Sequence, residues 1–376
     1  MTRVHRRPNN ERKIQTMKNQ NILRNRFISV CVLFALTQSL TAGTRAAVLY
    51  SSERPLIPSH PTYAVFDAPD STFTVPSAIT ATGVIIGSYV DANGVTHGFL
   101  RSRGGNFTTF DVPDSTSTTP TDINPGGVIT GWYTDTFGNL HAFIRARDGS
   151  ITSFDAPPGF DILGSPYGPG APPPSINPSG TIAGMYGAAF PNFVTHGFLR
   201  SSDGKLTTVD FPGASNTEVL AINPAGVIVG DFSDAVSGYQ GFLRTPDGTF
   251  TVIGPPGAQT IPAGINPAGA IAGGFSDGGT NHGYLRNPDG AFMTFDAPGS
   301  IYTSPTAINT AGAITGFYSD ADGVLHGFVR AGNGAIVTMD PPDSVSTFPV
   351  AISARGVITG VFMDSDGIGR AFVRMP

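Results

Sequence analysis

Histidine and aspartate recur together along the chain at a spacing that could support proton transfer. An aspartate stands five or six residues before a histidine in the pairs Asp91 and His97, Asp135 and His141, Asp277 and His282, and Asp320 and His326. A carboxylate beside an imidazole can act as a general acid–base dyad. An active site needs one such constellation, whereas this chain repeats it. We therefore interpret the pairs as polar clamps between adjacent strands.

An arginine closes the same segment in every copy of this pattern. The set comprises Arg101, Arg145, Arg200, Arg244, Arg286, Arg330 and Arg374. A ring of guanidinium groups could bind anions, because each group presents several donors in one plane. We instead expect each arginine to pair with a nearby carboxylate or with carbonyl groups of a loop.

Further aspartates follow the last strand-like run of most copies, at Asp67, Asp111, Asp155, Asp210, Asp296 and Asp340. Short Asp-x-Asp-Gly or Asp-x-Asn-Gly runs at 91–94, 320–323 and 364–367 also resemble parts of calcium loops, which gather carboxylates. None of these runs has the full twelve-residue loop with its terminal glutamate. We therefore interpret them as turns and expect neither a metal site nor a cofactor.

One run, Gly274–Gly278, matches the Gly-x-Ser-x-Gly pattern of hydrolase nucleophile elbows. That elbow requires a turn from a strand into a helix, whereas this run lies in a strand-to-strand hairpin that all copies share. We expect no catalytic role for Ser276, and we predict no catalytic residue set elsewhere in the chain.

An internal repeat supplies the elements that must position these residues. The segment at 221–230, AINPAGVIVG, returns in seven versions whose last glycines lie 43 to 53 residues apart: Gly87, Gly131, Gly184, Gly230, Gly273, Gly316 and Gly360. Each copy has four runs rich in β-branched and aromatic residues, which favour strands. The first run is short, as at 221–222. With 48 Gly, 32 Pro and only three Glu, the composition excludes an all-α fold.

Four strands in each repeat of about 44 residues are typical of a β-propeller blade. The seventh copy stops at Arg374, after its third run, and an isolated run of the fourth type, residues 63–69, precedes the first copy. We therefore predict an all-β, seven-bladed β-propeller over residues 62–376. In this fold the N-terminal strand completes the last blade and pairs an edge that a ring cannot leave open.

The His-Gly-Phe or His-Ala-Phe triplets of the third runs carry a family resemblance. They begin at His97, His141, His196, His282 and His326, while Gln240 and Arg370 replace the histidine in the remaining copies. The triplets resemble the HAF repeat of predicted extracellular bacterial proteins, and the resemblance covers essentially all of residues 62–376. It implies a repeat fold outside the cell and no particular activity.

Residues 1–46 are predicted to be a secretory signal peptide, and residues 47–61 a linker. A basic segment precedes a ten-residue apolar run at 27–36, and small residues follow near Ala42 and Ala46. Because this run is too short to span a membrane, we expect cleavage, no membrane insertion of the mature chain, and an extracellular or periplasmic location.

Cleavage would remove nine of the 22 Lys and Arg and one of the 27 Asp and Glu, which leaves a net charge of −13. It would also remove the only cysteine. A negative surface without a basic stripe argues against nucleic acid or an anionic membrane as a partner. We expect a monomer.

The repeat departs from its own pattern at two adjacent places, and binding residues are often found on such loops. The connection at 158–174 is long, and the hairpin at 187–195 in the next copy is long and apolar. Both kinds of loop open on one face of a propeller, where exposed aromatic rings could stack on sugars or anchor a protein loop. The candidate ligand-binding residues are Trp132, Tyr133, Phe160, Tyr167, Phe190 and Phe193.

These features favour a secreted, non-enzymatic recognition module that binds a glycan or an extracellular protein on one propeller face. One alternative is a polysaccharide hydrolase or lyase with two carboxylates near the central channel. Glu218, the only glutamate in the repeat region, is a weak candidate for one of them. A second alternative is a structural protein of the cell surface.

Overall fold

The computed structural model describes residues 61–163, 174–188, 194–234 and 238–376, and within these ranges the chain forms strands and turns with no helix. All of them belong to one of the two compact units of the chain. The other unit, Met1–Leu49 and Ser165–Ala171, lies outside the described residues. The predicted signal peptide and all but the last residue of the predicted linker also lie outside them. No described helix therefore has the length and apolar character that a membrane crossing requires.

Each sequence repeat forms one antiparallel unit, and we call these units blades 1 to 7 in chain order. Blade 1 comprises β2 (Ser71–Ile79), β3 (Ile85–Asp91), β4 (Thr96–Arg101) and β5 (Phe107–Phe110). Blade 2 comprises β6 (Ser115–Ile123), β7 (Ile129–Asp135), β8 (Leu140–Arg145) and β9 (Ile151–Phe154). Blade 3 comprises β10 (Asp161–Ile162), β11 (Ser175–Ile176), β12 (Ile182–Gly187), β13 (Thr195–Arg200) and β14 (Leu206–Val209).

The later blades repeat this order. Blade 4 comprises β15 (Asn216–Ile222), β16 (Ile228–Asp234), β17 (Gly238–Arg244) and β18 (Phe250–Ile253). Blade 5 comprises β19 (Gln259–Ile265), β20 (Ile271–Ser276), β21 (Asn281–Arg286) and β22 (Phe292–Phe295). Blade 6 comprises β23 (Tyr302–Ile308), β24 (Ile314–Ser319), β25 (Leu325–Arg330) and β26 (Ile336–Thr338). Blade 7 comprises β27 (Ser344–Ile352), β28 (Ile358–Asp364), β29 (Gly369–Arg374) and the N-terminal β1 (Tyr63–Phe66).

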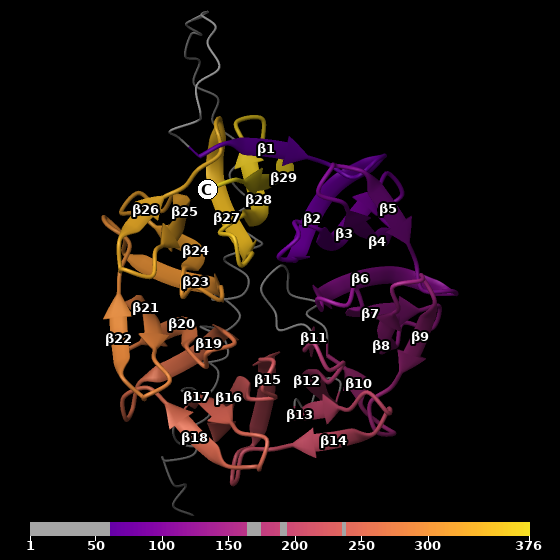
Figure 1. Ribbon diagram of the computed structural model, residues 1–376, viewed down its shortest axis with the longest axis horizontal. Coiled ribbons are helices and arrows are strands. Elements are labelled where there is room, and N and C mark those ends of the chain that lie inside the picture. Colours follow the sequence, from indigo (N-terminus) through magenta and orange to yellow (C-terminus); the bar gives the residue numbers. More distant parts are fainter. Residues whose placement is uncertain (1–60, 164–173, 189–193, 235–237) are drawn as a thin grey trace, which may run out of the picture. The chain divides into compact units, whose positions relative to one another are not determined.

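The first and last strands of the described chain close the ring (Figure 1). Strand β1 pairs antiparallel with β29, with Tyr63 opposite Arg374 and Phe66 opposite Ala371. Strand β2 of blade 1 then packs against β27 and β28 of blade 7. The predicted all-β propeller, with an N-terminal strand that completes the last blade, is therefore the observed fold.

The first strand of each blade is longer than the sequence predicted in every blade except blade 3. Residues 221–222 are only the end of β15, which begins at Asn216. The pairing register shifts at the middle of these strands, for example between Pro76 and Ala78 in β2. Five of these strands have a proline at the shift. Proline has no amide hydrogen for the ladder, so a bulge forms there and the strand continues on both sides. Strand β15 shifts in the same way between Val219 and Ala221 without a proline. The bulge interrupts the strand pattern of the sequence and hid the first half of these strands.

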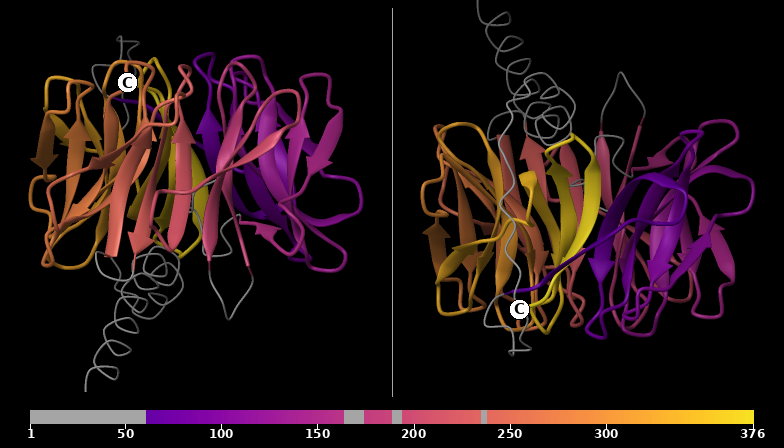
Figure 2. Two further views of the ribbon diagram at one scale, coloured as in Figure 1. Left: turned by 90° about the horizontal axis from the view of Figure 1, so that it is seen from below. Right: turned by 90° about the horizontal axis from the view of Figure 1, so that it is seen from above.

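The strands run between two faces of the propeller, which the edge-on views in Figure 2 display. One face is formed by the hairpins between the second and third strands and by the connections between blades, and we call it the hairpin face. The opposite face is formed by the Asn-Pro-x-Gly type turns and the hairpins between the third and fourth strands, and we call it the turn face. The predicted glycines sit at positive φ in these turns, for example Gly226 at 79° and Gly149 at 95°.

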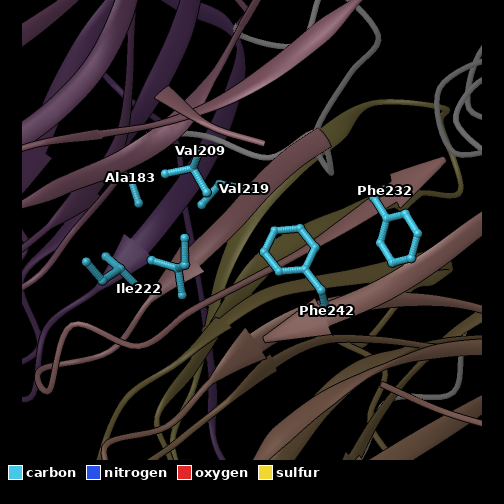
Figure 3. Close-up of a cluster of buried hydrophobic side chains, with 7 residues drawn as sticks. Ala183, Val209, Val219, Ile222, Phe232 and Phe242 are labelled. Atoms are coloured by element: carbon cyan, nitrogen blue, oxygen red, sulfur yellow. The ribbon is translucent and has the colours of Figure 1, made fainter. Parts of the chain in front are cut away.

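Hydrophobic side chains from neighbouring blades meet in buried clusters that hold the ring together. Between blades 3 and 4, Val209 and Ala183 pack with Val219, Ile222 and Phe242 (Figure 3). Phe242 is fully buried, and its counterparts in the third strands of the other blades are equally buried: Phe99, Phe143, Phe198, Tyr284, Phe328 and Phe372. These clusters fix the blades and therefore the loops on both faces.

Candidate functional site

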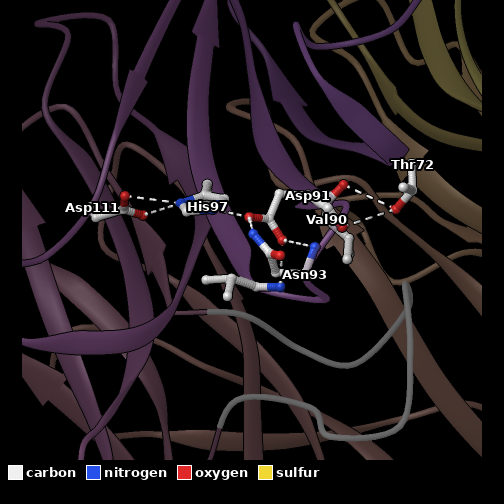
Figure 4. Close-up of polar contacts among 7 residues, drawn as sticks. Thr72, Val90, Asp91, Asn93, His97 and Asp111 are labelled. Carbon is white, nitrogen blue, oxygen red and sulfur yellow. Dashed lines mark hydrogen bonds and ion pairs between the residues drawn. The ribbon is translucent and has the colours of Figure 1, made fainter.

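The repeated histidines on the hairpin face lie between carboxylates. In blade 1, His97 Nδ1 lies 2.9 Å from Asp111 Oδ2, and its Nε2 lies 3.7 Å from Asp91 Oδ2 (Figure 4). Asp91 also accepts hydrogen bonds from the amides of Asn93 and Val95 and so shapes its own turn. The arrangement ties the second hairpin to the end of the fourth strand.

The same clamp recurs in other blades with small variations. The shorter contact is always to the aspartate 14 residues after the histidine: Asp155 for His141, Asp210 for His196, Asp296 for His282 and Asp340 for His326. The second contact, to the aspartate before the histidine, is 3.3 Å in blade 2 and 3.4 Å in blade 6. The clamp interpretation is confirmed, and three of the four predicted Asp–His pairs are in contact, in blades 1, 2 and 6. The closer partner of each histidine, however, is an aspartate that the sequence pattern did not pair with it.

Strand register explains this correction. In blade 1, Gly98 lies opposite Phe110, so Asp111 comes directly beside the preceding residue, His97. The aspartates of the second hairpin also come from a neighbouring strand, but they are less well aligned: in blade 1, Tyr89 and not Asp91 lies opposite His97. In blade 5, no ion pair within 4.0 Å joins Asp277 to His282 among the described residues. Two sets of aspartates that the sequence treated separately therefore belong to one cluster.

Blade 7 has an arginine in place of the histidine. Arg370 Nε lies 2.8 Å from Asp364 Oδ2, and its Nη1 lies 3.4 Å from Asp67 Oδ2. Asp67 follows β1, so this clamp joins the two ends of the described chain. In blade 4, Gln240 replaces the histidine and Gly254 stands where the other blades have the aspartate after the fourth strand. Both partners of the clamp change together there.

The carboxylates shift the pKa of two histidines. Burial alone would lower the pKa of His141, but the hydrogen bonds and charges of Asp155 and Asp135 outweigh it and raise the pKa. His326 shows the same balance with Asp340 and Asp320. On the other side of the clamp, the hydrogen bond from the Val324 amide and contact with His326 lower the pKa of Asp320.

These shifts predict a pH-dependent stability. The raised histidine pKa values contribute stability that is fully present below the unfolded value near 6.5 and is lost as the pH rises through the folded values. We expect the wild-type melting temperature to fall by about 1–2 °C across that range, because partly exposed ion pairs contribute at most about 1 kcal/mol each. The double variant H141R/H326R, which copies Arg370, should show a flatter profile between pH 6 and 9. If the melting temperature of this variant depended on pH as steeply as that of the wild type, His141 and His326 would not be the groups responsible.

Four of the repeated arginines stack on aromatic rings of the preceding blade, and Arg244 lies over Phe250 of its own blade. The guanidinium carbon lies 4.6 Å from the Phe66 ring centre for Arg101 and 4.8 Å from the Phe110 ring centre for Arg145. Arg200 and Arg330 make the same contact. The predicted contact with loop carbonyls is present at long range, 3.4 Å for Arg330. Loop carbonyls, one of the two predicted kinds of partner, are therefore confirmed for Arg200, Arg286 and Arg330. For the four stacked arginines no ion pair with a carboxylate is present among the described residues, and the cation–π contact takes its place.

The structure separates the six candidate aromatic residues. Tyr133 stacks on His141 with ring centres 5.0 Å apart, and Tyr89, Tyr186 and Tyr318 repeat this stack in other blades. Phe160 packs edge-on against His196 at 5.6 Å and joins the core around blade 3. Both residues are half-buried and belong to the packed clamps, and their part in binding a ligand stays a prediction.

Trp132 is half-buried on β7, opposite Thr119 of β6. Tyr167, Phe190 and Phe193 lie outside the described residues. The long connection at 158–174 contains the short strand β10, which pairs with β12. The strand that follows the connection, β11, also pairs with β12. Asp122 of blade 2 holds this return by accepting hydrogen bonds from Ser175 and from the Ile176 amide.

An exposed aromatic residue that the sequence reasoning missed is Phe137, whose side chain is 89% exposed. It sits at the tip of the second hairpin of blade 2, in a turn where Asp135 accepts hydrogen bonds from the amides of Phe137 and Asn139. The other blades with this turn have polar residues there, Asn93, Asp322 and Asp366. A comparison of the repeats position by position would have revealed it.

Phe137 has exposed apolar neighbours on the same face. Seven of the large hydrophobic side chains that are exposed among the described residues lie at the hairpin face: Val95, Phe137, Val194, Ile301, Val324, Val345 and Ile368. Six are in its loops, and Val345 is at the start of strand β27. Single exposed apolar residues need no explanation, but their concentration on one face of a domain is typical of an interaction surface.

The same face has three aspartates in a left-handed backbone conformation. Asp70, Asp114 and Asp343 have φ of 59°, 61° and 64° and are exposed, whereas the corresponding connections of other blades use glycines such as Gly213 and Gly299. A side chain at such φ costs free energy that glycine avoids. The three connections are consecutive around the ring, between blades 6, 7, 1 and 2. We call Asp70, Asp114 and Asp343, with Val95, Phe137, Val324, Val345 and Ile368, the acidic sector.

The structure gives less support to the other candidate sites, namely a metal site, a nucleophile elbow and a carboxylate pair. Within the described residues no group of three or more His, Cys, Asp or Glu side chains could hold a metal ion. Ser276 ends β20 in a strand-to-strand hairpin, so the nucleophile elbow is absent there. Glu218 and Asp231 lie directly opposite each other on β15 and β16, and they are only 5% and 3% exposed.

Comparison with known proteins identifies the fold but no family. No protein-family model matches the chain, and no curated protein sequence matches it. A solved structure of virginiamycin B lyase from Staphylococcus aureus is 14% identical, with a TM-score of 0.54, and the match covers 84% of this chain and 99% of that one. At this identity the similarity shows the β-propeller fold alone.

Two further solved structures are similar in the same way. A prolyl endopeptidase is 12% identical with a TM-score of 0.58, and the match covers 82% of this chain and 51% of that one. The β-propeller domain of the Trilobed protease from Pyrococcus furiosus is 8% identical with a TM-score of 0.53, over 81% of this chain and 94% of that one. That domain is described as having an open velcro topology, whereas β1 closes the ring here. Membership of the HAF-repeat family stays a prediction.

Proposed function

We propose that this β-propeller is a secreted, non-enzymatic recognition module that binds a protein partner through the acidic sector. The observation that carries the proposal is the coincidence, on adjacent blades, of strained exposed aspartates with exposed apolar side chains. Strain of this kind persists where the surrounding structure or a function maintains it. The repeated histidine clamps beneath hold the loops in place.

The chemistry of the sector indicates the partner's surface. Phe137 is an exposed aromatic side chain on a turn whose backbone is hydrogen-bonded to Asp135, and Val345 and Ile368, 53% and 44% exposed, add aliphatic area. Interfaces typically bury such anchors at their centre and place charged groups at the rim. Asp70, Asp114 and Asp343 would face lysine or arginine there. Aliphatic side chains suit a protein surface better than a sugar ring, so a protein is favoured over a glycan.

Removal of the strained aspartates separates binding from stability. We expect the triple variant D70G/D114G/D343G to unfold at the wild-type temperature or above, because glycine relieves the strain at positive φ. The variant should nevertheless bind a panel of arrayed lysine- and arginine-rich peptides at least tenfold more weakly than the wild-type chain. Biolayer interferometry gives the affinities, and thermal unfolding gives the stability.

Two further variants locate the site. F137S should lower the affinity for the same peptides about tenfold. V337S should leave that affinity unchanged, because Val337 is 55% exposed but lies on β26 at the outer edge of blade 6. Equal binding by all variants would overturn the proposed surface. A hit on a parallel glycan array that F137S abolishes would instead favour sugar recognition.

Carbohydrate cleavage is the second candidate, supported by the facing pair of Glu218 and Asp231. Paired carboxylates can act as acid and nucleophile when they are about 5 Å apart. Both side chains are nearly enclosed, which disfavours access by a polysaccharide. Release of reducing ends from a glycan by the wild-type chain, and its loss in E218Q, would establish this function in place of simple binding.

A further inference from the structure

Charged residues are divided unequally between the two faces of the propeller. The hairpin-face loops and strand ends contain 18 of the 25 Asp and Glu in the described residues, and Arg370 is the only described Lys or Arg there. The other 11 described Lys and Arg stand at the turn face: seven end the third strands, and four lie in turns, Arg103, Arg147, Lys205 and Arg355. The described aspartates of the turn face are Asp122, Asp148, Asp203, Asp247 and Asp289. One face is therefore acidic and the other has a net positive charge.

Three exposed arginines of the turn face lie on consecutive blades, Arg355 on blade 7, Arg103 on blade 1 and Arg147 on blade 2. In the described part of the chain none of them forms an ion pair or stacks on an aromatic ring. The one exposed acid in the turns of these blades is Asp148, whose carboxylate accepts hydrogen bonds from Ser150. Positive charge therefore prevails there, and we call Arg103, Arg147 and Arg355 the basic sector.

An apolar cavity lies beside two of these arginines. It has a volume of about 70 Å³, it lies between blades 7 and 1, and Arg103 and Arg355 are among its lining residues. Most of the lining is apolar and includes Ile79, Val357 and Met375. Met375 is 42% exposed, and methionine adapts its shape to the group that it contacts. The turn face therefore combines an apolar depression with neighbouring cationic side chains.

The acidic sector has the complementary arrangement, because its exposed apolar side chains stand among Asp70, Asp114 and Asp343. These aspartates are exposed, and they belong to no ion pair within the ranges that the structure describes. Both sectors lie on blades 7, 1 and 2, at opposite faces, as the edge-on views in Figure 2 allow the reader to follow. A second copy displaced along the axis of the ring would therefore bring its arginines over these aspartates.

We propose that the partner of the acidic sector is the turn face of a second copy of this chain, so that propellers stack head to tail. The inference rests on the proposed function and identifies its partner, in place of the monomer expected from the sequence. Complementary charge selects which surfaces meet, and apolar contact at the centre supplies affinity. Because the two surfaces differ, each contact leaves one free surface on either copy, and further copies can add.

Sedimentation velocity of the purified protein over a concentration series tests the stacking. The wild type should associate at 0.15 M NaCl and do so at least tenfold more weakly at 1 M, where the Debye length falls from about 8 Å to about 3 Å. R103Q/R147Q/R355Q should remain monomeric and melt at the wild-type temperature. K205Q is the matched control, because Lys205 is an exposed turn-face cation of blade 3 that lies near Asp203. It should associate like the wild type.

A mixing experiment identifies the two surfaces. D70G/D114G/D343G keeps the basic sector, and R103Q/R147Q/R355Q keeps the acidic sector, so each should be monomeric alone and the mixture should form only a one-to-one dimer. A monomeric mixture, or association of the arginine variant by itself, would overturn head-to-tail stacking. If the wild type stays monomeric but binds the arrayed basic peptides, the second copy is excluded and the proposed function stands. Loss of both results would overturn both proposals.

Discussion

Replacement of Gly230 by alanine is expected to destabilise the protein by more than about 4 kcal/mol, or to prevent its folding. A Cβ atom at this position would lie 1.9 Å from the Glu218 carbonyl oxygen and 2.9 Å from the Phe242 ring. Neither the backbone of β15 nor the fully buried ring can move aside without disturbing the packed core. The measurement is the free energy of unfolding from denaturant titration.

Gly264 provides the matched control for this experiment. It also lies in a blade strand, but a Cβ atom there would approach only Ile308, at 3.7 Å, and other blades have alanine at this position, as at Ala221. G264A should change the stability by less than about 1 kcal/mol. If G230A were as stable as G264A, the closing glycines of the repeat would not be required by packing.

The N-terminal strand provides the second large effect. F66A is expected to lower the free energy of unfolding by about 3–5 kcal/mol. Phe66 is 7% exposed and packs against Phe99 and Phe107 of blade 1. The guanidinium of Arg101 stacks on its ring. The loss should appear as a lower denaturant midpoint in equilibrium unfolding. It should also expose the β29 edge, so association at high concentration is a second readout.

Val65 is the control on the same strand. Its side chain is 50% exposed, and V65A keeps the backbone pairing with Phe372 intact. The free energy of unfolding of this variant should fall by less than about 0.5 kcal/mol. Equal losses in F66A and V65A would mean that β1 contributes only through its backbone, and that the ring is not sealed by the Phe66 cluster.

The fold was predictable because each repeat contains residues that mark where its strands end and its turns begin. The period, the turn glycines and the isolated strand at 63–69 together indicate a propeller with a strand from one end of the chain in the last blade. The bulges were not predictable. In five of the first strands the bulge falls at a proline, which indicates a strand end as readily as an interruption, and in β15 it falls where there is no proline. The predicted first strands are therefore too short.

The candidate site was predicted less well, because register and stacking decide which side chains meet. Asp111 and His97 are 14 residues apart, and only the pairing of β4 with β5 brings them together. The aromatic character of Tyr133 indicates a binding residue, yet the residue repeats in other blades as part of a stack with histidine. Phe137 is a single unusual residue in a turn of ordinary length, so a long insertion does not mark it.

The latch between β1 and β29 also has a consequence for the order of events during translation. Asp67 leaves the ribosome 303 residues before its partner Arg370. Blades 1 to 6 can form while β1 has no neighbour, and blade 7 forms only once β29 has been made. An unpaired β1 is therefore exposed to other chains until then, and chaperone protection of this strand should matter most just before β29 emerges.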